Sequence, residues 1–144
     1  MSSHGGAPLK IVQALGISIS GPLSISPDGQ FLAYLHEVSA NEANLGMRVA
    51  ITPAGGGATY RVLDVPSNIG GPRWSPDGRS LQYLQTKDGV SNLWEQPLAG
   101  GPSKQFTRFS SGLIFDFSWS PDGSHLLLTR GDVSSDVVLL RGLR

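Results

Sequence analysis

The sequence predicts an all-β fold made of a repeated unit, and three observations lead to that prediction. The tetrapeptide Ser-Pro-Asp-Gly begins at Ser26, Ser75 and Ser120, so it recurs at steps of 49 and 45 residues. Apolar side chains stand two residues apart after each copy, which is the period of a strand with one buried face. A further strand-like segment begins 18 residues before each serine. Repeats of this length that hold four strands are typical of the blades of a β-propeller.

Each repeat is expected to form one antiparallel blade. The first blade spans residues 19–64, with strands at 19–25, 30–37, 47–53 and 58–64. The second spans 69–109, with strands at 69–74, 79–86, 91–97 and 102–109. The third spans 113–141 and holds three strands, at 113–119, 124–130 and 136–141. Residues 1–7 are expected to be a disordered leader, and residues 8–144 a single propeller unit.

The repeated tetrapeptide predicts a tight turn between the first two strands of each blade. Proline fixes φ at the first turn position, aspartate favours the second, and glycine accepts the left-handed conformation that follows. We therefore expect the turn residues to shape hairpins and not to bind metal or to act as catalytic carboxylates. They are Pro27, Asp28, Gly29, Pro76, Asp77, Gly78, Pro121, Asp122 and Gly123.

The third blade lacks its fourth strand, whereas Pro8–Leu15 is a spare strand of that kind. Three blades cannot bring the two ends of one chain together, because closed rings have about four to eight blades. We therefore expect a homodimer with six blades, in which Pro8–Leu15 of each copy pairs with Asp136–Arg141 of the other. Such closure leaves no strand edge exposed. The alternative is a fragment whose missing blades lie elsewhere, and which would aggregate or expose its ends.

Aromatic side chains at equivalent strand positions are expected to fill the spaces between blades. Those beside the turns and on the third strand are Tyr34, Trp74, Tyr83, Trp94 and Trp119. A second group is expected to pack between the second and third blades, and it comprises Phe106, Phe109, Phe115 and Phe117.

The run Trp74–Tyr83 resembles the WD40-like (PD40) repeat of TolB-type β-propellers. The same repeat is found in the N-terminal propellers of prolyl-oligopeptidase-type enzymes. The closing runs, Phe117–Gly123 and Ser135–Arg141, resemble the last blade of bacterial proteins that join a Ser/Thr kinase to a TolB-like propeller. The resemblance covers residues 8–141. It implies a propeller that binds partners, as in TolB, or a sensory module, as in the kinase-linked group.

Composition argues against several classes of function. The 11 basic and 11 acidic residues balance, whereas nucleic-acid binders are usually basic, and the absence of cysteine excludes disulfides and thiolate chemistry. No Gly-x-Ser-x-Gly elbow and no His/Asp/Glu cluster with metal-site spacing is present. We expect no cofactor and no intrinsic catalysis. Membrane insertion is not expected. The compartment stays open, because the absence of a signal peptide favours the cytoplasm whereas TolB family members are periplasmic.

A binding surface is expected where the loops between the second and third strands meet the loops between blades. In propellers these loops surround one mouth of the central channel. The residues expected to contact a ligand or a protein partner there are Asn41, Glu42, Asn44, Asn68, Lys87, Asp88, Arg130 and Asp132.

Three functions remain open. The leading one is a non-catalytic propeller for protein interaction or ligand sensing, which assembles into a closed ring. The second is the propeller part of a larger enzyme, either a kinase-linked sensor or the gating domain of a peptidase. The third is a structural half-propeller, natural or engineered, whose main property is self-assembly.

Overall fold

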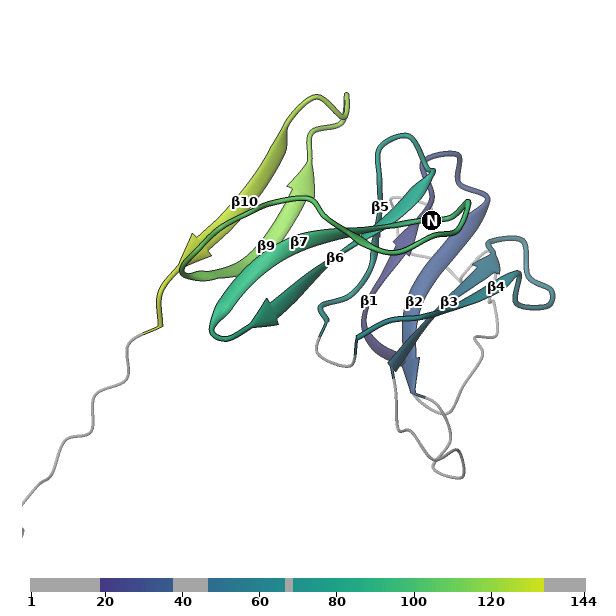
Figure 1. Ribbon diagram of the computed structural model, residues 1–144. Coiled ribbons are helices and arrows are strands. Elements are labelled where there is room, and N and C mark those ends of the chain that lie inside the picture. Colours follow the sequence, from purple (N-terminus) through teal and green to yellow (C-terminus); the bar gives the residue numbers. More distant parts are fainter. Residues whose placement is uncertain (1–18, 38–46, 67–68, 134–144) are drawn as a thin grey trace, which may run out of the picture.

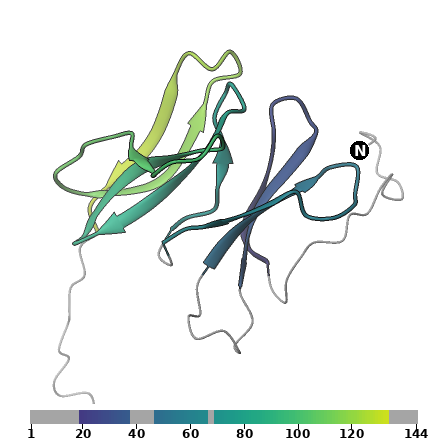
Figure 2. The same cartoon turned by 45° about the vertical axis from the view of Figure 1, so that its right-hand side comes forward.

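The computed structural model describes residues 19–37, 47–66 and 69–133, and all regular elements in these ranges are strands. The first antiparallel sheet contains β1 (Ile19–Ile25), β2 (Phe31–Glu37), β3 (Met47–Pro53) and β4 (Arg61–Asp64), in that order. The second contains β5 (Arg73–Trp74), β6 (Ser80–Lys87), β7 (Val90–Pro97) and β8 (Lys104–Gln105). The third pairs β9 (Leu113–Trp119) with β10 (Leu126–Gly131). Figures 1 and 2 show the sheets following one another, with their first hairpin turns on the same side.

Two strands of the second sheet are shorter than predicted. Strand β5 has two residues, and Ile69 forms only an isolated bridge with Gln85, because the intervening Gly-Gly-Pro run ends at Pro72, which has no amide hydrogen to donate. Strand β8 also has two residues. Beyond it the hydroxyl of Thr107 accepts a bond from the Leu93 amide at 2.9 Å, so a side chain replaces a carbonyl of the backbone ladder.

The three Ser-Pro-Asp-Gly turns share one set of hydrogen bonds. In the first, the Gly29 amide donates to the Ser26 carbonyl at 2.8 Å, and the Ser26 hydroxyl donates to Asp28 Oδ1 at 2.5 Å. The Gln30 amide donates to the same carboxylate oxygen at 3.0 Å. The glycines have φ values of 72°, 69° and 70°, in the left-handed region that glycine accepts without strain. Each turn therefore needs its serine, its aspartate and its glycine for separate reasons.

The first and second sheets bury an apolar core between them. It is built from Ala33, Leu35, Val49 and Ile51 of the first sheet and from Trp74 and Leu81 of the second. Trp74 also bonds across this interface, because its amide donates to the Ser24 hydroxyl at 3.2 Å and its indole nitrogen donates to the Ser24 carbonyl at 3.1 Å. The residue before the second turn thus joins the two sheets by burial and by hydrogen bonds.

The second and third sheets meet through a more polar interface. The indole nitrogen of Trp119, which is half-buried, donates to Gln82 Oε1 at 2.7 Å, and its ring packs edge-on against Phe106 at 6.0 Å. Phe117 is buried here. The prediction for Phe115 is wrong, because its side chain is 53% exposed. Phe115 is the residue skipped where the register of β9 and β10 shifts, and such a bulged residue is unpaired.

The turns themselves pack against one another from sheet to sheet. A Cβ atom added to Gly78 would lie 3.5 Å from Pro27 Cδ, and one added to Gly123 would lie 2.7 Å from Pro76 Cβ. The proline of one turn therefore sits against the glycine of the next. At Gly123 glycine is required for close approach as well as for its positive φ, whereas at Gly78 the 3.5 Å contact is an ordinary van der Waals distance.

Several predicted features fall outside the described residues. They are the strands at 8–15 and 136–141, and with them the proposed exchange between chains. Within the described ranges, no helix that could span a membrane is found.

Candidate functional site

One hollow of the described structure runs along the first strands of all three sheets. Its volume is about 550 Å³. Residues 22–25 of β1, both residues of β5 and the end of β9 line it, together with residues of the three turns. The outer strands β4 and β8 contribute nothing to its walls. We call this hollow the inner groove.

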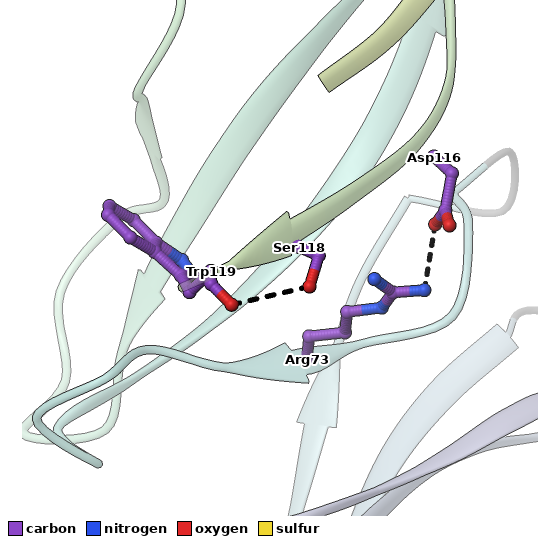
Figure 3. A network of polar contacts seen from close by, with 4 residues as sticks. All are labelled: Arg73, Asp116, Ser118 and Trp119. Atoms are coloured by element: carbon purple, nitrogen blue, oxygen red, sulfur yellow. Dashed lines mark hydrogen bonds and ion pairs between the residues drawn. The ribbon is translucent and has the colours of Figure 1, made fainter. Parts of the chain in front are cut away.

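An ion pair joins Arg73, which lines the inner groove, to Asp116 of the third sheet, which does not line it. Arg73 Nη2 lies 2.7 Å from Asp116 Oδ1, and the guanidinium stands 4.9 Å from the centre of the Phe117 ring. Figure 3 shows Arg73 of β5 reaching toward Asp116, with Ser118 and Trp119 farther along β9. The Arg73 side chain is 34% exposed and that of Asp116 is 61% exposed, so solvent or a ligand can reach both. The groove thus presents the guanidinium of Arg73, held in place by Asp116, and the indole of Trp119.

The wall of the inner groove carries the negative charge of Asp122. The hydroxyls of Ser120 and Ser124 and the Ser124 amide donate to the carboxylate of Asp122. These bonds favour the charged form and lower the pKa of Asp122 to about 2. Asp122 is therefore ionised throughout the physiological pH range.

Two residues that the sequence places at the channel mouth lie at the β6–β7 hairpin: Lys87 is the last residue of β6, and Asp88 begins the turn. Asp88 and Gly89 have φ values of 51° and 77°, which fits an Asp-Gly hairpin of the primed type. Both Lys87 and Asp88 line a hollow of about 320 Å³ that also includes Asn92 and Phe109. Asp88 therefore has a conformational role in the turn besides its exposed charge.

Arg130 lies in the last part of β10 and Asp132 follows the strand. The end of β10 lies close to the β6–β7 turn in both views (Figures 1 and 2). The Arg130 guanidinium stacks on Phe109 at 3.6 Å and donates to the Ser111 carbonyl at 2.7 Å. Phe109 lines the neighbouring hollow, so it connects the two pairs of charged residues. We call Lys87, Asp88, Arg130 and Asp132 the loop face.

The remaining residues of the predicted surface, Asn41, Glu42, Asn44 and Asn68, lie outside the described residues. Among the residues that are described, no group of three or more His, Cys, Asp or Glu side chains could hold a metal ion.

Comparisons with known proteins agree on one architecture. No protein-family model matches the chain. Tricorn protease homolog 1 of Streptomyces coelicolor is 30% identical over 103 residues, which are 72% of this chain and 9% of that protein. The Tol-Pal system protein TolB of Alcanivorax borkumensis is 36% identical over 77 residues, which are 53% of this chain and 18% of that protein.

Two solved structures superpose on the sheets. TolB of Acinetobacter baumannii aligns with a TM-score of 0.58 and 20% identity, over 82% of this chain and 28% of that one. The β-propeller domain of the trilobed protease of Pyrococcus furiosus, described as having an open velcro topology, aligns with a TM-score of 0.53 and 23% identity, over 76% and 33%. This chain has the fold of a TolB-like β-propeller. Its sheets are blades. The matched part of this chain spans less than a fifth of the tricorn protease homolog and of the Alcanivorax borkumensis TolB.

The inner groove of this TolB-like propeller was not predicted from the sequence. Ser24, Arg73 and Ser118 stand at the same position, two residues before the serine of each turn. Polar residues at that position in all three repeats were the available signal. The pairing of Arg73 with Asp116 could not be read in this way, because it depends on how far the second and third blades turn toward each other.

Proposed function

We propose that this TolB-like propeller is a non-catalytic recognition module that binds a partner polypeptide or a ligand in the inner groove. The observation that carries the proposal is that all three blades contribute walls to one hollow of about 550 Å³. A site assembled from several repeats offers more contact than any single loop. The loop face is proposed as a second contact surface at the other end of the blades.

The chemistry of the inner groove suits a polypeptide. The exposed side chains of Leu23 and Ile25 provide apolar surface on β1, and the indole of Trp119 provides more on β9. Arg73 offers a cation that its ion pair with Asp116 holds in place, and Asp122 offers an anion. A groove of this mixed character can orient a bound chain through polar contacts while apolar contacts stabilise it.

The proposal can be tested with a displayed library of random peptides selected on the full chain. Peptides that bind the inner groove should lose affinity roughly tenfold or more for Asp116→Asn, because that change breaks the ion pair and frees Arg73. Isothermal titration gives the affinity.

The matched control is Arg48→Gln. Arg48 and Asp64 form an ion pair of similar length, 2.8 Å, on the outer strands β3 and β4, away from the groove. Binding that survives Asp116→Asn, or that weakens equally in the control, contradicts recognition in the inner groove.

A second function is favoured by the names of the similar proteins. The tricorn protease homolog and the trilobed protease propeller are both peptidase-related, so we also propose, as the alternative, a propeller that accompanies the catalytic domain of a peptidase. The full reading frame distinguishes the two, because the alternative requires a catalytic domain on the same polypeptide. Turnover of peptidase or esterase substrates by the 144-residue chain itself, lost on a single serine or histidine substitution, would contradict both.

A further inference from the structure

The two interfaces between blades use the same sequence positions. The residue seven positions after the serine of one turn meets the residue just before the serine of the next: Ala33 packs in one core with Trp74, and Gln82 bonds to Trp119. The turns also pack in the same way at both interfaces, because Pro27 lies against Gly78 and Pro76 lies against Gly123. Each blade therefore has a forward face and a backward face with defined contact positions.

The two end blades leave these positions open. Leu127, on the forward face of the third blade, is 58% exposed, whereas its counterparts Ala33 and Gln82 are 0% and 1% exposed. Ile25, on the backward face of the first blade, is 59% exposed, whereas its counterpart Trp74 is 8% exposed. Both are large apolar side chains at positions that the internal interfaces bury.

The turns of the end blades are open in the same way. A Cβ atom added to Gly29 would meet nothing within 4 Å, although the equivalent glycines each face a proline. Pro121, the proline with no following turn among the described residues, is exposed. The forward face of the third blade and the backward face of the first blade are thus the two halves of the interface that the chain already forms twice.

We propose that a second copy of this chain covers both end faces, with Leu127 of each copy against Ile25 of the other and Pro121 against Gly29. This inference goes beyond the proposed function, because it assigns a contact with a second copy of the chain, in which Ile25 and Pro121 of the inner groove take part at the first and third blades. Two apolar side chains replace the polar Gln82–Trp119 contact. Two copies make two identical interfaces around one axis, and closure of this kind limits the assembly instead of extending it into filaments.

A charge exchange between the two positions tests the pairing. Leu127→Glu alone and Ile25→Lys alone each place one unpaired charge in both interfaces of a dimer, and each should be monomeric. An equimolar mixture should form a one-to-one heterodimer, because one of its interfaces is then wild type and the other joins Glu to Lys. Sedimentation equilibrium should give twice the mass of one chain for the wild type and for the mixture.

Two controls accompany the exchange. Tyr60→Glu places the same charge at an exposed aromatic residue that neither end face uses, and it should remain dimeric. Leu127→Ala should raise the dimer dissociation constant roughly tenfold or more without introducing a charge, and circular dichroism checks that every variant is folded. A monomeric wild type, filaments, or single variants that stay monomeric when mixed would each overturn the proposal.

Discussion

Trp74 and Trp119 hold the same place before their turns, yet their contacts differ. Trp74 is buried in the apolar core between the first two blades, whereas Trp119 is half-buried beside the inner groove. The indole of Trp119 is the partner of a buried amide oxygen of Gln82. Trp74 therefore stabilises the fold mainly through burial. Much of the contribution of Trp119 to stability comes from its hydrogen bond.

Replacing the two tryptophans should separate these contributions. Trp74→Ala should lower the free energy of unfolding by about 3–5 kcal/mol, the usual range for removing a buried aromatic side chain. Trp119→Ala should cost less through lost burial, but it leaves Gln82 without its donor, which adds about 1–3 kcal/mol. Urea denaturation of both variants measures the difference. Unchanged stability of Trp119→Ala would show that the residue serves binding and not folding.

Each Ser-Pro-Asp-Gly turn is an element with two tasks. It closes a hairpin through its serine and aspartate, and it packs against a neighbouring turn, with Pro27 against Gly78 and Pro76 against Gly123. The serine hydroxyls are the main cause of the lowered pKa values of Asp28, Asp77 and Asp122. The carboxylates are more acidic when the chain is folded, so folding and ionisation of the turns favour each other.

The pH dependence of stability should follow from these carboxylates. A pKa that folding lowers gives stability that is fully present above the unfolded value and is lost as the pH falls through the folded value. For Asp122 that window runs from about pH 3.8 down to about pH 2. Thermal melting of the wild type should therefore decline over this window, and the decline should be shallower in Asp122→Asn. An identical acid decline in the variant would contradict a role for this carboxylate.

The sequence predicted those elements whose residues carry their own local signal. Turn chemistry located the hairpins, and alternation located the strands that follow the turns, such as β2 and β6. Prediction from the sequence failed where tertiary contacts determine the local structure. Thr107 ends the ladder of β8 by replacing a carbonyl, and the bulge in β9 turns Phe115 outward. The fit of Pro76 against Gly123 and the Arg73–Asp116 pair both depend on the angle between blades, which no periodicity records.

At the scale of the whole molecule, the open end faces and the exposed strand edges both leave surface that a neighbouring blade would normally cover. The third blade has two strands among the described residues, and Leu127 and Val133 expose apolar surface there. Leu23 and Ile25 do so on the first blade. Apolar surface of this kind at both ends of a repeat array favours association, because repeats bury their faces only against neighbours.

Deleting residues 1–15 tests the exchange of strands that the sequence predicts. If Pro8–Leu15 completes the third blade of the other copy, the truncated chain should melt at a lower temperature and dissociate at higher concentration, because it loses both a ladder of hydrogen bonds and its apolar face. Sedimentation equilibrium and thermal melting measure the two effects. Replacing only residues 1–7 with a Gly/Ser sequence of equal length is the control and should change neither. A truncated chain with the same oligomeric state and melting temperature as the full one would refute strand exchange. The charge exchange between Leu127 and Ile25 would then still show whether contact between the end faces is sufficient to close the ring.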